Sequence, residues 1–142
     1  MVEEGNIETV FYEGSITTSD DFIETMQRPS TVAVFVLRGR RVIGFAYLNG
    51  FQGNMAFGHF CFMRECHDTV DDIGRQIMSY WTGPLGVDYV MGVVPGFNDR
   101  AMDFVQRIGF KRVGEVPAMI KSVYRPERAD ANIFYYRGEE HG

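Results

Sequence analysis

The sequence predicts an α/β (α+β) protein in which a mixed sheet carries helices on its faces. Three strand-length apolar runs follow one another between residues 31 and 63, a spacing typical of an antiparallel meander. From residue 69 onward the apolar residues recur first at helical spacing and then alternate between strand and helix patterns. That order of elements predicts helices packed against a central sheet.

The first half of the chain predicts strands and one short helix. Residues 8–12 read as a strand, and a Thr-Ser-Asp-Asp run caps a helix over residues 18–26, because side-chain oxygens and carboxylates suit a helix start. Residues 31–37 and 41–48 are apolar and β-branched, with Arg38-Gly39-Arg40 between them. This pattern predicts a hairpin.

A further strand is predicted over residues 55–63, after a loop over residues 49–54 that Asn-Gly and Gly-Asn pairs bracket. Because side chains alternate along a strand, Phe57, His59 and Cys61 are expected on one face.

The second half predicts two helices between strands. The first runs from Thr69 to Trp81 behind a capping box in which Asp replaces the usual Glu. A strand at 89–94 follows, and Asn98 caps a second helix that Gly109 ends. The remaining expectations are a strand at 111–115, a loop at 117–129 and a strand at 132–137, which complete a single domain over residues 1–142.

Composition narrows the possible partners. The chain has 19 acidic and 14 basic side chains and a net charge of −5, which argues against nucleic acid. Its longest apolar runs are strand-length, so we expect no membrane contact and a cytoplasmic protein. Cys61 and Cys66 lack the spacing of a zinc site, so free thiols and no metal are expected.

The segment from Asn98 to Gly114 resembles the C-terminal signature of the GNAT superfamily of N-acetyltransferases. Asn98 is followed by Ala101 and then by a helix end that runs into Gly109-Phe110. The order of elements over residues 31–137 also resembles that superfamily. The resemblance implies a mostly antiparallel sheet of six to seven strands in which strands 4 and 5, here 55–63 and 89–94, splay apart.

The resemblance also implies a site for acetyl-CoA in that wedge. The pantetheine arm would lie beside the fourth strand, and the pyrophosphate would lie at the start of the next helix. The residues implied in cofactor binding are Cys61, Phe62, Met63, Arg64, Gly74, Arg75 and Asn98.

The sequence departs from the superfamily where the pyrophosphate should bind. The expected Arg/Gln-x-x-Gly-x-Gly/Ala loop is missing, because no glycine lies between Met63 and Gly74. Instead Asp68, Asp71 and Asp72 stand at the helix start, where their charge would repel a diphosphate. Acetyl-CoA could therefore bind weakly or differently, or the fold could have lost it.

Catalysis requires a base and often an acid. His59 lies on the strand that supplies the superfamily's base, although a buried histidine bonded to nearby backbone is an equal alternative. Val105 occupies the position where many members carry an acidic Tyr, so direct thiolate departure or an acid from elsewhere, such as Tyr124, would be needed.

Two main functions follow. The first is an N-acetyltransferase that moves an acetyl group from acetyl-CoA to an unknown small-molecule or peptide amine. The alternative is a non-catalytic GNAT-like binding or assembly protein, resembling some phage-encoded ones, that has lost coenzyme A and that could form a homodimer. A small-molecule binder that uses the same wedge for another ligand is a third possibility.

Overall fold

The computed structural model describes residues 31–138. The strand expected at 8–12 and the helix expected at 18–26 lie outside these residues. In chain order the elements are β1 (Val32–Arg38), β2 (Arg41–Gln52), β3 (Met55–Phe62), the 3₁₀ turn η2 (Arg64–Cys66), α3 (Val70–Thr82), β4 (Tyr89–Pro95), α4 (Asp99–Arg107), β5 (Lys111–Ile120) and β6 (Ala129–Arg137).

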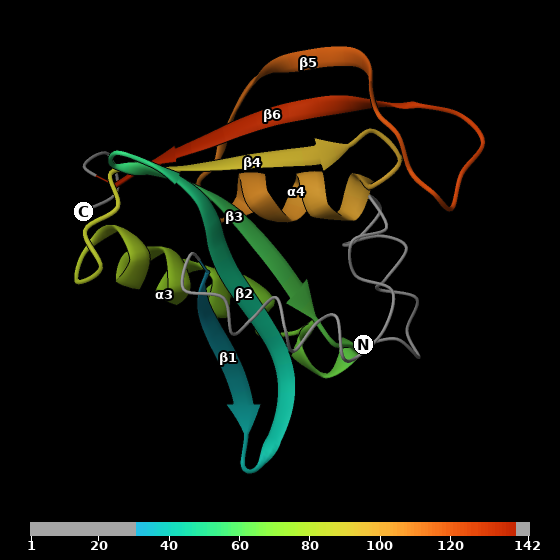
Figure 1. The fold of residues 1–142 in the computed structure, drawn as a ribbon. Helices are drawn as coiled ribbons and strands as arrows, with labels where there is room; N and C mark the ends of the chain where they lie inside the picture. The colour runs from blue at the N-terminus through green and yellow to red at the C-terminus, as the bar shows by residue number, and fades with distance from the viewer. Residues whose placement is uncertain (1–30, 139–142) are drawn as a thin grey trace.

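One six-stranded sheet contains all the described strands, in the order β1-β2-β3-β4-β6-β5 (Figure 1). Every neighbouring pair is antiparallel except β3 and β4, which are parallel and connected through α3. A parallel pair needs such a long crossover, whereas antiparallel neighbours do not. The predicted mixed, mostly antiparallel sheet flanked by helices is confirmed.

The parallel pair β3–β4 separates along its length. Residue pairing begins at Met55↔Tyr89 and ends at Phe57↔Met91, although β3 continues to Phe62 and β4 to Pro95. Figure 1 shows the two strands diverging from a common end. The expected splay between these strands is confirmed, and it opens a wedge in the middle of the sheet.

Helices α3 and α4 pack against one face of the sheet and against each other. Phe60 of β3 lies at the centre of this contact, with its ring centroid 5.6 Å from that of Trp81 in α3 and 5.3 Å from that of Phe104 in α4. The two helices meet at Gly74, where an added Cβ would lie 2.8 Å from Phe104 Cζ. The predicted helical stripe that includes Met78 and Trp81 is therefore core.

The two helix starts differ. Asn98 caps α4 as predicted, because its Oδ1 accepts a hydrogen bond from Ala101 N at 3.2 Å. The capping box predicted at Thr69 is wrong, since its side chain makes no bond to the first turn of α3. Instead Thr69 Oγ1 donates to the Cys66 carbonyl at 3.3 Å, because the turn η2 places an acceptor behind it.

The first residues of two predicted loops, 49–54 and 117–129, belong to strands. Strand β2 continues to Gln52, with Gly50 at φ +61° where the register with β3 shifts, and the chain turns only at Gly53. Strand β5 continues to Ile120 through a register shift at which Ala118 has φ +51°. In both places a bulge absorbs residues whose composition suggests a turn.

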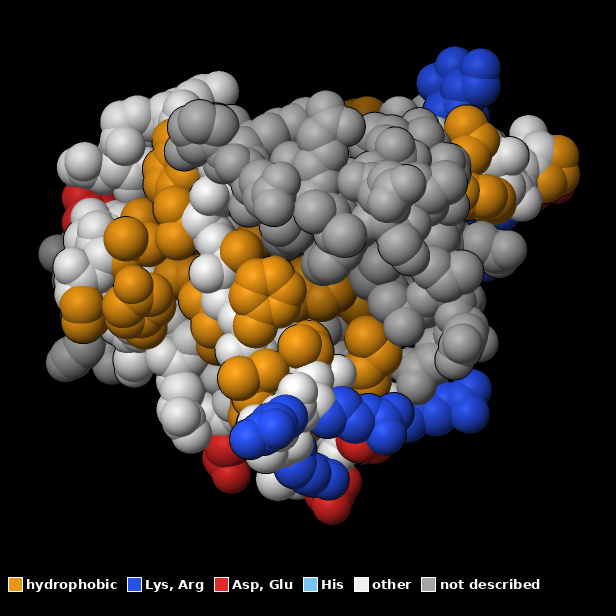
Figure 2. All heavy atoms as spheres, turned by 60° about the horizontal axis from the view of Figure 1, so that its bottom comes forward, with side chains coloured by type: hydrophobic (Ala, Val, Ile, Leu, Met, Phe, Trp, Pro, Cys, Tyr) orange, Lys and Arg blue, Asp and Glu red, His pale blue; other side chains and the backbone are white. Residues whose placement is uncertain are grey.

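Figure 2 shows Lys and Arg side chains beside hydrophobic ones on the face that includes the β1–β2 hairpin. Arg38, Arg40 and Arg41 surround its turn, and Phe35 and Leu37 nearby are exposed.

Within residues 31–138, none of the helices is long and apolar enough to cross a membrane.

Candidate functional site

A cavity of about 820 Å³ occupies the wedge between β3 and β4. Residues 57–62 of β3 line one side and residues 92–95 of β4 line the other, both at or beyond the last pair of the parallel ladder. Further walls come from Tyr47 and Asn49 of β2, Arg64, His67 and Val70 before and at the start of α3, Met119 of β5, and Asn98, Arg100, Ala101, Phe104, Val105, Arg107 and Phe110 in and around α4.

The edge of β3 that faces this cavity pairs with β4 over a short stretch only, among the residues that the structure describes. Its other edge pairs with β2 as far as Gly44↔Phe62, but pairing with β4 stops at Phe57. An extended ligand with amide groups could therefore add to β3 as a further strand would.

His59 lies in this cavity wall, stacked on the residue directly across the sheet. Its ring centroid is 4.5 Å from that of Tyr47, at an interplanar angle of 17°. Its Nε2 lies 2.8 Å from Asn49 Oδ1. Because a carbonyl oxygen accepts, this contact assigns the proton to Nε2 and leaves the Nδ1 lone pair as the acceptor.

Burial lowers the pKa of His59 from 6.5 to about 4, because a half-buried ring is poorly solvated when charged. The imidazole is therefore neutral at pH 7 and able to accept a proton. The sequence interpretation missed Asn49 and Tyr47 as its neighbours, because the pair Asn49-Gly50 was expected to start a loop. The alternation of side chains along a longer second strand would have placed them beside His59.

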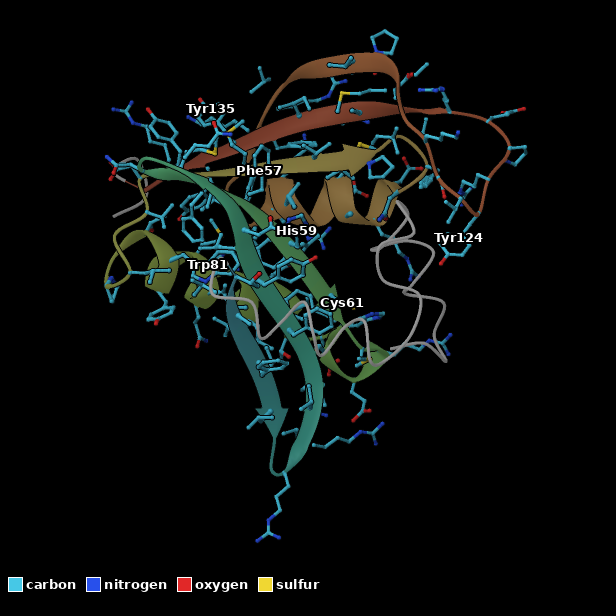
Figure 3. All side chains as sticks on the ribbon, viewed as in Figure 1. Phe57, His59, Cys61, Trp81, Tyr124 and Tyr135 are labelled. Carbon is cyan, nitrogen blue, oxygen red and sulfur yellow. The ribbon has the colours of Figure 1, made fainter. Side chains whose placement is uncertain are left out.

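The structure brings five of the predicted site residues to one cavity. His59, Cys61, Phe62, Arg64 and Asn98 all line it. Cys61 is buried, with 3% exposure, and follows His59 on the same face of β3 (Figure 3). Both cysteines are free thiols.

Four other predicted site residues are not among the described residues that line the cavity. Gly74 is at the α3–α4 contact. Arg75 is exposed and donates to Asp72 Oδ1 at 3.4 Å and to the Arg107 carbonyl at 3.3 Å. Met63 donates its backbone N–H to the Ile43 carbonyl. Tyr124 lies in the loop between β5 and β6, away from His59 (Figure 3).

The carboxylates at the start of α3 have cationic partners. Asp71 Oδ2 lies 2.9 Å from Arg107 Nε, and Asp72 Oδ1 lies 3.4 Å from Arg75 Nη1. The cavity itself has the opposite charge to the chain as a whole. Among the residues that the structure describes, its lining includes three arginines and no Asp or Glu.

Val105, the position matched to the superfamily's acidic Tyr, lines the cavity and is buried. No hydroxyl is therefore available from that position. Within residues 31–138, no group of three or more His, Cys, Asp or Glu side chains is arranged to hold a metal ion.

No family model matches the sequence, and no curated protein matches it. Solved structures do match its fold. The spermidine N-acetyltransferase from Vibrio cholerae in complex with CoA and spermine has a TM-score of 0.79 and 15% identity, over 94% of this chain and 83% of that one.

Two further solved structures also match the fold of this chain. A chimera of the Vibrio cholerae enzyme with hSSAT has a TM-score of 0.76 at 14% identity, over 87% of this chain and 79% of that one. A GNAT-family acetyltransferase from Bacillus anthracis has a TM-score of 0.71 at 13% identity, over 87% of this chain and 77% of that one. The chain thus has the fold of the GNAT N-acetyltransferases.

Proposed function

We propose that this protein is a GNAT-type N-acetyltransferase that uses acetyl-CoA and an amine acceptor. The observation that carries the proposal is the early end of the β3–β4 ladder at Phe57↔Met91, beyond which the two strands separate and line a cavity. The fold alone would leave activity open, since one fold hosts many functions.

The residues present fit coenzyme A in two respects. Its pantetheine arm is a chain of amides, which suits the strand edge of β3 beyond Phe57, where pairing with β4 has ended and the strand lines the cavity. Its phosphates are anionic, which matches a lining that has arginines and no carboxylate among the described residues. Acetyl-CoA supplies an activated thioester, so the protein has to orient the two substrates and accept a proton.

His59 is the proposed base. Its neutral ring and the Nδ1 lone pair can take a proton from the acceptor ammonium, directly or through water. The backbone of Cys61 and Phe62 is proposed to hold the pantetheine, and Asn98 to lie near the coenzyme. With Val105 in place of a phenol and Tyr124 outside the lining, we propose that the thiolate departs without an acid, since thiols have pKa values near 8.5.

The acceptor class is proposed to be a small amine, because the similar Vibrio cholerae structure holds spermine. A second candidate is a GNAT-like protein that binds coenzyme A or a partner without catalysis. The absent phenol at Val105 and the lowered pKa of His59 favour it, because a weak base transfers protons poorly.

The test combines binding and turnover. Isothermal titration with acetyl-CoA should show saturable binding, and release of free thiol should depend on an added amine. His59→Gln should keep binding and lose turnover by about 10²-fold or more. His67→Gln, which changes another histidine in the lining, is the matched control.

Absence of binding at millimolar acetyl-CoA would overturn the proposal. Tight binding with no thiol release from any amine in a broad panel would favour the second candidate.

A further inference from the structure

The end of the cavity beside α3 has arginine side chains where the superfamily has a glycine-rich loop. Arg64 follows β3 directly, and Arg107 is the last residue of α4. Both line the cavity, although 43 positions separate them in sequence. Gly74 lets α3 approach α4 closely, and Arg107 lies beside Asp71 in the first turn of α3.

Arg107 is held by one edge of its guanidinium group. Its Nε donates to Asp71 Oδ2 at 2.9 Å and to Asp71 Oδ1 at 3.2 Å. A guanidinium has five N–H donors in a rigid plane. Within residues 31–138 its four Nη donors have no hydrogen-bond partner, and they belong to a side chain that lines the cavity.

Arg64 is also available. Its side chain is exposed and makes no hydrogen bond or ion pair with any residue that the structure describes. Two arginine side chains in the lining of one cavity, with donors that no described residue occupies, are suited to phosphate, which arginine binds through two parallel hydrogen bonds.

Asp71 and Asp72 then have different roles. Asp71 is the less exposed, with 33% of its side chain accessible against 78% for Asp72. Its carboxylate fixes the plane of Arg107, and the ion pair neutralises the charge that would repel an anion. Asp72 pairs with Arg75, which does not line the cavity.

We propose that Arg107 and Arg64 bind the phosphate groups of the acyl donor in place of the glycine-rich loop, and that Asp71 is a positioning residue for Arg107. This inference rests on the proposed function, because the donor is taken to be a coenzyme A thioester.

The first test compares arginine variants in phosphate-free buffer. Coenzyme A and inorganic pyrophosphate are each titrated into the wild-type chain, Arg107→Gln, Arg64→Gln and the control Arg75→Gln. The first two variants should bind coenzyme A about tenfold more weakly or worse, as expected for losing a charge-assisted contact. Arg75→Gln removes the same charge nearby and should stay within about twofold.

The second test separates positioning from simple charge. If charge alone mattered, removing a carboxylate near an anion site should tighten anion binding, because it removes a repulsion. Asp71→Asn is nevertheless expected to weaken coenzyme A binding about threefold or more, because Arg107 loses its anchor. Asp72→Asn, the matched control, should leave the affinity unchanged or slightly raised. Circular dichroism checks that each variant is folded. Loss of an exposed ion pair of this kind should not unfold the protein.

The outcomes are distinguishable. Equal losses in Arg107→Gln and Arg75→Gln, or tighter binding in Asp71→Asn, would overturn the inference. Coenzyme A binding that survives both Arg107→Gln and Arg64→Gln would overturn it while leaving the proposed function supported. Wild-type binding of pyrophosphate but not coenzyme A would overturn the proposed function and, with it, the assignment of these arginines to an acyl donor. Binding of neither would overturn both.

Discussion

His59 Nε2 lies 2.8 Å from Asn49 Oδ1 across the β2–β3 pair. In register, His59 is opposite Tyr47, so Asn49 is its diagonal neighbour on the same face of the sheet. The contact fixes the tautomer, while burial keeps the ring neutral. The imidazole is thus oriented by a side chain on a neighbouring strand, whereas the sequence had offered a bond to nearby backbone as an alternative.

Stability should depend on pH through His59. Its pKa is 6.5 in the unfolded chain and about 4 in the folded one, so the unfolded state alone gains this proton as the pH falls through that window. The free energy of unfolding should therefore decrease with acidification from pH 6.5 to about 4, by on the order of 3 kcal/mol.

Urea unfolding of the wild-type chain and of His59→Gln is measured over that pH range. The difference between their free energies of unfolding isolates the contribution of His59, because the carboxylates titrate in both proteins. His67→Gln, an exposed histidine, should retain the wild-type dependence. An identical pH dependence in wild type and His59→Gln would contradict the buried, neutral ring.

Gly74→Ala should destabilise the protein by about 1–3 kcal/mol. The added methyl would meet Phe104 Cζ at 2.8 Å and Ile108 Cγ2 at 3.1 Å, so α3 and α4 must move apart. Thermal and urea unfolding provide the measurement. Gly114→Ala is the control, since nothing lies within 4 Å of its added Cβ, and a change within about 0.5 kcal/mol is expected there. Equal stability of the two variants would refute the close helix contact.

Ala118→Gly should stabilise the protein by about 0.5–1 kcal/mol. Ala118 has φ +51° at the bulge of β5, while its N–H donates to Asp130 Oδ1 at 2.9 Å. Glycine adopts this conformation without the steric penalty of a Cβ atom. The penalty that is avoided is larger than the extra conformational entropy that glycine loses on folding. Ala129→Gly, at a residue without positive φ in β6, should instead destabilise. Differential scanning calorimetry would show shifts of opposite sign, and a decrease in melting temperature for both would count against the strained bulge.

Cys66 should resist thiol reagents in the folded state. Its side chain is fully buried and donates to the Ile43 carbonyl at 3.1 Å. Burial raises the pKa of the Cys66 thiol, and the Glu65 and Asp68 carboxylates act in the same direction while Arg38 opposes them. In the Cys61→Ser background, maleimide labelling should be slower than in urea by about two orders of magnitude or more. Native labelling at the unfolded rate would show that Cys66 is accessible.

The sequence contained much of this fold because periodicity reports local structure. Helical spacing from Val70 to Trp81 marked α3, and Asn98, Ala101 and Gly109 marked the start and end of α4. The ends of strands were harder to predict from the sequence. Asn49-Gly50 has the composition of a turn but lies at a bulge within β2.

The charge arrangement at the site was not predictable from local pattern. The sequence placed Asp71 and Asp72 where they would repel a diphosphate, but Arg107 reaches Asp71 from 36 positions away. That contact depends on how α3 packs on α4, and packing between distant segments leaves no periodic signal. The acid excess of the chain therefore says little about the charge inside its cavity.

The short ladder between β3 and β4 has a mechanical consequence. Pairing of β3 with β4 runs only from Met55↔Tyr89 to Phe57↔Met91. The sheet therefore consists of two three-stranded ribbons, β1-β2-β3 and β4-β6-β5, that pair with each other at one corner. Beyond Phe57 and Met91, the described residues of the two ribbons are connected through side chains and through α3 and α4. The relative position of the two halves of the sheet therefore depends on the packing of Phe60 against Trp81 and Phe104 as well as on this short ladder.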